Sequence, residues 1–201
     1  MDDELSRLLH SIDQKIGDDG QALELPEPFA HLTPDERQRL TALSQEATTA
    51  MHMCIIGVQQ NIAPLAQHTF DAYVSKGGQE LGIDEISERY TAFVCAGFSR
   101  CCMIGNMMIE RGNMAPDTLL VLANYDANAA VPDHIRDTAM KCVTHALNHE
   151  HAECDATYDA FIDSITDPTD LAYFIPMLIT TVAGAEQAQI VHIPGPDADD
   201  E

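Results

Sequence analysis

The chain has 201 residues, enough for one domain with a substantial core, and 45% of them are hydrophobic, as in folded globular proteins. It carries 33 acidic residues against 10 lysines and arginines, which gives a formal net charge of −23. Because so acidic a surface repels phosphate backbones and anionic lipids, we expect the protein to bind neither nucleic acid nor membranes.

Helical periodicity runs through most of the sequence and predicts an all-α fold, a single-domain bundle of about six or seven helices. Residues 1–32 are expected to form a short helix and a proline-containing connector, followed by a helical core domain over 33–192. The core begins at a capping box in which Thr33 is the N-cap and Glu36 the third helical residue. We expect Pro64 to kink or end the helix that follows.

The rest of the core is also predicted to be helical. Caps and apolar spacing predict helices over about 84–111, 117–125, 132–165 and 166–190. The last of these contains Pro176, where we expect a kink. Residues 193–201 are rich in aspartate and proline, which predicts a disordered acidic tail.

Two of these helices are apolar nearly all round, over 93–109 and 172–185. Both segments are shorter than the roughly 20 residues that cross a bilayer, so we interpret them as two central helices of the bundle. Gly97, Cys101 and Gly105 form a ridge of small side chains that would let a neighbouring helix approach closely. A second copy of the chain is one way to cover 172–185, so a homodimer is one expectation.

The compartment is predicted from the N-terminus and the cysteines. The opening "MDDELSRLLH" lacks the basic segment of a signal peptide, and the six cysteines show no CxxC spacing. We therefore expect reduced thiols in a cytoplasmic protein.

The stretch "KCVTHALNHEHAEC" at 141–154 concentrates residues that bind transition metals. Four of them share one shoulder of the predicted helix: Cys142, His145, His149 and Glu153. The first two histidines of the stretch are four residues apart, so they could share a zinc or iron ion. A complete site would need ligands from another helix, for which His52 and His68 are the candidates.

The alternative for this stretch is an ordinary solvated helix face. His149 with Glu153 and His151 with Asp155 are acid–base pairs one turn apart, which support a surface helix. The HExxH and ExxH patterns of known metal-binding helices are missing. The sequence therefore favours the solvated face, with no bound cofactor, over the zinc or iron site.

Two charges fall on otherwise apolar faces, Arg100 in the segment 93–109 and Glu150 in the long helix. Because a buried charge needs a partner, we predict that the two face each other or line a small polar pocket that binds a ligand. The alternative is that Arg100 reaches solvent and that the helix breaks near "NHEH", which would turn Glu150 outward.

An acidic row follows the histidines, formed by Asp155, Asp159, Asp163 and Asp167. The row, the charge excess and the lack of a GxSxG or Walker template favour a non-enzymatic module that binds a basic protein partner through its acidic surface. The alternative function is a helical bundle that binds a metal ion or a small ligand. A third hypothesis is an enzyme whose site is assembled from distant residues.

Overall fold

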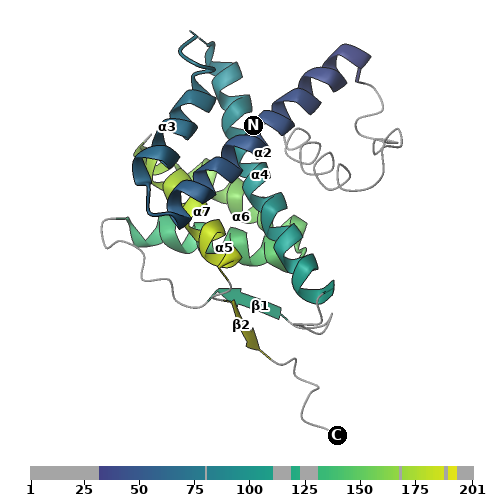
Figure 1. The fold of residues 1–201 in the computed structure, drawn as a ribbon, viewed down its shortest axis with the longest axis vertical. Helices are drawn as coiled ribbons and strands as arrows, with labels where there is room; N and C mark the ends of the chain where they lie inside the picture. Colours follow the sequence, from purple (N-terminus) through teal and green to yellow (C-terminus); the bar gives the residue numbers. More distant parts are fainter. Residues whose placement is uncertain are drawn as a thin grey trace, which may run out of the picture. The chain divides into compact units, whose positions relative to one another are not determined.

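A computed structural model of the chain describes residues 32–79, 81–110, 119–122, 131–167, 169–187 and 190–193. The helices in these residues are α2 (Pro34–Gln59), α3 (Ala63–Val74), α4 (Ile83–Glu110), α5 (Asp133–Leu147), α6 (His151–Ser164) and α7 (Thr169–Glu186) (Figure 1). Six helices in the described part of the chain confirm the all-α prediction. The short helix expected near the N-terminus and residues 194–201 of the expected acidic tail lie outside the described residues, whereas residue 193, where the tail was expected to begin, belongs to a strand.

The chain divides into two compact units, Met1–Ser99 and Arg100–Glu201, and the division falls inside α4. In the first unit, α2 begins at the predicted capping box. The Thr33 hydroxyl accepts a hydrogen bond from the Glu36 amide, and the Glu36 carboxylate accepts one from the Thr33 amide. The helix ends at Gln59, and Pro64 lies in the first turn of α3. Proline has no amide hydrogen, and amides in the first turn of a helix have no acceptor within that helix, so no hydrogen bond is lost.

A buried arginine, which the sequence analysis did not single out, ties the first unit together. Arg89 on α4 is 5% exposed, and its Nε donates to the Tyr73 carbonyl at 2.7 Å. Its guanidinium pairs with Glu46 on α2 at 2.9 Å and lies 4.3 Å from the centre of the Tyr73 ring. The Tyr73 hydroxyl donates in turn to the Arg89 carbonyl. One side chain thus links α2, α3 and α4 while leaving no buried charge unpaired.

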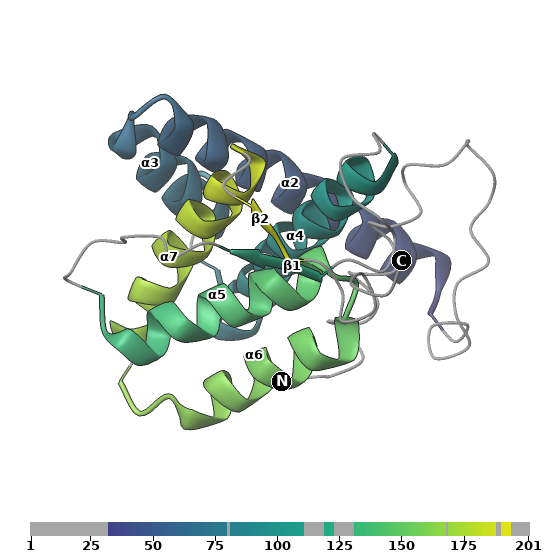
Figure 2. The ribbon, with the colours of Figure 1, turned by 90° about the horizontal axis from the view of Figure 1, so that it is seen from below.

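In the second unit, α5 packs against α6 and against α7 (Figure 2). The single helix predicted over 132–165 is wrong, because the chain breaks between Leu147 and His151. His149 has a φ of 59°, a left-handed conformation that a right-handed helix cannot contain. The break near "NHEH" is the alternative that the sequence left open.

The prediction of a short helix over 117–125 is also wrong for the four of its residues that the structure describes, 119–122. Strand β1 (Leu119–Leu122) pairs there with strand β2 (Ile190–Ile193) as an antiparallel two-stranded ribbon. Leu119 lies opposite Ile193 and Leu122 opposite Ile190. The pairing partner is distant in the sequence, so local periodicity could not reveal it. Helix α7 contains Pro176 and ends at Glu186, before β2.

Helix α4 is long and apolar enough to cross a membrane, judged by length and composition alone. Core helices of folded proteins meet the same criterion, and 67% of the most apolar window of α4 is buried within the protein. This burial agrees with the predicted central helix.

Candidate metal centre

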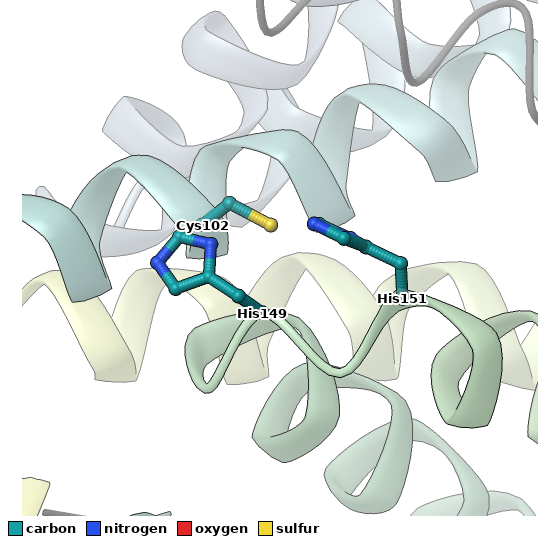
Figure 3. Close-up of side chains that lie close together, drawn as sticks. All are labelled: Cys102, His149 and His151. Carbon is teal, nitrogen blue, oxygen red and sulfur yellow. The ribbon is translucent and has the colours of Figure 1, made fainter. Parts of the chain in front are cut away.

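Cys102, His149 and His151 form a group that could hold a metal ion. Each residue offers one ligand atom, and these atoms lie within 4.8 Å of one another. Figure 3 shows the Cys102 sulfur on α4 between the two imidazole rings, which come from the turn after α5 and from the first residue of α6. Cys102 is buried, while both histidines are half-buried.

A glycine allows α4 to come close enough to the end of α5 to form the group. Gly105 lies one turn after Cys102 on α4, and a Cβ there would lie 2.2 Å from the carbonyl oxygen of Leu147. No side chain fits at that distance, so the close approach requires glycine at this position. The predicted small-residue ridge is confirmed at Gly105, and it brings Cys102 beside the turn that carries His149.

The break between α5 and α6 directs both histidines towards one point. In a continuous helix, residues two positions apart point to different sides. The left-handed backbone at His149 interrupts that geometry, and the two rings come to lie edge to face with centroids 6.0 Å apart. The break therefore converts "HEH" from a helix surface pattern into a pair of candidate ligands.

The surroundings of His151 favour the form of its ring that binds a cation. Burial lowers the pKa of the His151 imidazole, and the neighbouring His149 ring lowers it further. A neutral imidazole is the form that binds metals. The His149 Nε2 atom is buried and has no hydrogen-bond partner among the described residues. A buried polar atom without a partner is costly. In Figure 3, however, the His149 nitrogen nearer the Cys102 sulfur is Nδ1, so the unpartnered Nε2 is not the atom that faces the other two ligands.

Of the four metal ligands predicted from the sequence, the structure places only His149 in the group. Cys142 is buried beside Cys154, whose thiol donates to the Cys142 carbonyl. The His145 ring contacts the Glu150 carboxylate at 2.7 Å, and Glu153 is exposed. The predicted shared shoulder required one unbroken helix, and the break removes it.

The two histidines proposed from other helices do not belong to the group either. His52 lies on α2 and His68 on α3, and both side chains are exposed. The group contains Cys102 in their place, one of the six cysteines that the sequence predicts to be reduced thiols and does not single out as a ligand.

The structure gives the two charges on apolar faces different partners. Arg100 forms an ion pair with Glu186 on α7 at 2.5 Å, and Glu150 contacts His145. The two are thus not brought together as a pair, and their role in binding a ligand stays a prediction. Both are half-buried, so each charge retains contact with solvent as well as with its partner.

A cleft of about 390 Å³ lies in the first unit, and the residues that line it precede Arg100 in the sequence. It is lined by Phe70, Asp71, Val74, Ser75, Gln79, Leu81, Ile86 and Tyr90. Among the described residues its lining contains one carboxylate and no histidine or cysteine, so these residues offer no second set of transition-metal ligands.

The acidic row is largely on the surface. Asp159 and Asp163 are exposed on α6, and Asp155 is half-buried. Asp167 lies beyond the end of α6, where it accepts hydrogen bonds from the amide and the hydroxyl of Thr169. The row thus has a local capping role at one end, and its role in binding a partner stays a prediction.

Comparison of the chain with protein-family models, with curated proteins and with solved structures finds no significant match. No activity or ligand can therefore be transferred to it from a relative, and the function of the site has to be argued from its own chemistry.

Proposed function

We propose that the protein binds a transition-metal ion, zinc in the first place, through Cys102, His149 and His151. The observation that carries this proposal is the convergence of one thiol and two imidazoles from separate segments on one point. Sulfur and nitrogen donors in that number are the ligands that zinc prefers, whereas magnesium and calcium need oxygen.

The geometry is close to what zinc requires. With Zn–S near 2.3 Å and Zn–N near 2.0 Å, ligand atoms on a tetrahedral ion lie roughly 3.5 Å apart. The present separations are at most 4.8 Å, so the group needs to close by no more than about 1.3 Å, which rotation of half-buried histidine side chains can supply. Iron(II) fits the same donors less well because it favours more oxygen and nitrogen ligands.

The net charge of −23 adds a general attraction for cations around the site. That attraction is not selective, however, and it acts on any divalent ion. The selectivity for zinc is therefore assigned to the thiol and the imidazoles, and this assignment can be tested by substitution.

The test measures zinc content by elemental analysis and zinc affinity by competition with a coloured chelator. Cys102→Ser, His149→Gln and His151→Gln should each lower the affinity by at least about 100-fold, because a three-ligand site loses one ligand. Glu153→Gln and His68→Gln are the controls: both residues are exposed, and both were candidate ligands of the site predicted from sequence alone. Wild-type protein without zinc, or equal losses in the controls, would rule out the proposed centre.

A second candidate function is the binding of a basic protein partner through the acidic surface. The exposure of Asp159 and Asp163 on α6 favours it. Co-purification with a basic protein should be lost in the double variant Asp159→Asn/Asp163→Asn and kept in Asp35→Asn/Asp84→Asn, which removes the same charge from exposed positions of the first unit. Equal behaviour of the two double variants would leave only non-specific charge attraction.

A further inference from the structure

The side chain of Asn148 bridges the end of α5 and strand β1. The Leu120 amide donates to Asn148 Oδ1 at 2.7 Å, and Asn148 Nδ2 donates to the Leu120 carbonyl at 2.8 Å. Nδ2 also donates to the Thr144 carbonyl at 2.8 Å, one turn back on α5. One amide thus pairs with both the backbone N–H and the backbone C=O of a single residue, as a residue on a neighbouring strand would, and also satisfies a helix-end carbonyl.

These bonds fix the residue directly before a candidate metal ligand. Asn148 is the C-cap of α5, and His149 follows in the left-handed conformation. After it, the Glu150 amide donates to the His145 carbonyl at 2.9 Å, and the Glu150 carboxylate contacts the His145 ring. The turn is therefore held on both sides of His149 by contacts that do not involve the ligand atoms.

A left-handed histidine is a strained conformation that persists only where its surroundings hold it. The same conformation is what places the His149 and His151 rings on one side. A contact that holds the turn therefore also holds the metal ligands in their binding arrangement before any ion arrives, which raises affinity by lowering the cost of ordering them.

We infer that Asn148 is a positioning residue of the metal centre, which couples the ion to the β1–β2 ribbon through Leu120. The inference rests on the proposed zinc binding. It assigns Asn148 no contact with the ion: the amide acts by fixing the turn. Because coupling between two sites is reciprocal, zinc at the centre should stabilise the Asn148–Leu120 contact to the same extent as that contact strengthens zinc binding.

The first experiment compares zinc affinity in wild type and Asn148→Ala. We expect a loss of about 10-fold to 100-fold, the size seen when groups that orient metal ligands are removed. Phe161→Leu is the matched control, since Phe161 is buried on α6 in the same unit and its truncation lowers stability without touching the turn. A merely structural role for Asn148 predicts that both variants melt earlier and that both keep the affinity of the wild type.

The second experiment uses wild-type protein, so it tests the inference even if Asn148→Ala fails to fold. Hydrogen exchange of the Leu120 amide is measured with and without zinc, and we expect exchange to slow by the same 10-fold to 100-fold factor. Unchanged exchange in a protein that binds zinc would overturn the inference and leave the proposed function intact. A wild-type protein that binds no zinc at all would overturn both.

Discussion

Gly105 gives the sharpest test of how the metal centre is assembled, through the substitution Gly105→Ala. The new Cβ would lie 2.2 Å from the Leu147 carbonyl oxygen and 3.3 Å from its carbonyl carbon. An ordinary C···O contact needs at least about 3.3 Å, so α4 and the end of α5 would have to separate by roughly 1 Å. The obstacle is backbone, which cannot rotate aside as a side chain can.

The magnitude follows from two opposing effects. Adding a carbon to a tightly packed contact costs about 1–3 kcal/mol, and a backbone obstacle places this case at the upper end. Replacing glycine by alanine inside a helix contributes about 1 kcal/mol in the other direction. We therefore expect a net loss of about 2 kcal/mol, which lowers the melting temperature by about 4–8 °C for a chain of this size.

Thermal and urea unfolding followed by circular dichroism measure this loss, with Gly82→Ala as the control. A Cβ at Gly82 meets nothing within 4 Å, so that variant should stay within about 0.5 kcal/mol of the wild type. Zinc affinity should fall in Gly105→Ala alone, because Cys102 moves away from the histidines. If Gly105→Ala is as stable as the wild type, the close approach of α4 to Leu147 does not exist and the geometry of the centre has to be abandoned.

Further predictions address zinc, the first unit and one surface carboxylate. Zinc at 100 times its dissociation constant should stabilise the protein by about 2.7 kcal/mol, and a chelator should reverse the shift in melting temperature; no shift would argue against the centre. Arg89→Met should cost about 2–3 kcal/mol in urea unfolding, since it removes the buried charge-assisted bond to the Tyr73 carbonyl and the partner of Glu46. Glu46→Gln at the exposed end should cost less than about 1 kcal/mol, and similar losses in the two variants would contradict this division. The Thr169 hydroxyl and amide bonds lower the pKa of Asp167, so their contribution to stability is present above the ordinary carboxyl pKa and is lost as the pH falls through the lowered value. Thr169→Ala should raise the Asp167 pKa measured by NMR, and an unchanged value would show that the hydroxyl bond is absent in solution.

Features that depend on neighbours in the sequence could be predicted. The capping box at Thr33 and Glu36 needs only residues within one turn, and its two hydrogen bonds form as expected. The extent of α4 follows from its apolar run and its acidic first turn. Gly105 was also identified, because small residues at helical spacing indicate a close contact even when the partner helix is unknown.

Features that depend on residues distant in the sequence could not be predicted. The strand at Leu119–Leu122 exists by pairing with Ile190–Ile193, and neither segment carries a strand pattern long enough to be recognised alone. The break after Leu147 depends in the same way on Leu120, whose backbone N–H and C=O both bind the Asn148 side chain. Helical periodicity continues across "NHEH" and hides the break from any count of apolar spacing.

The candidate metal centre was missed for a related reason. Any set of ligands chosen from one helical wheel must be spaced by three or four residues, and His149 and His151 are spaced by two. The left-handed residue that ends α5 is His149, whereas Asn148 before it has a φ of −95°, so the usual asparagine signal for a left-handed helix end does not apply here. No local signal distinguishes Cys102 from its neighbour Cys101, because both are buried and the choice depends on the rotation of α4 that the Gly105 contact fixes. The group is therefore a product of tertiary structure, and its ligands become recognisable only when the contact at Gly105 and the turn at Asn148 are known together.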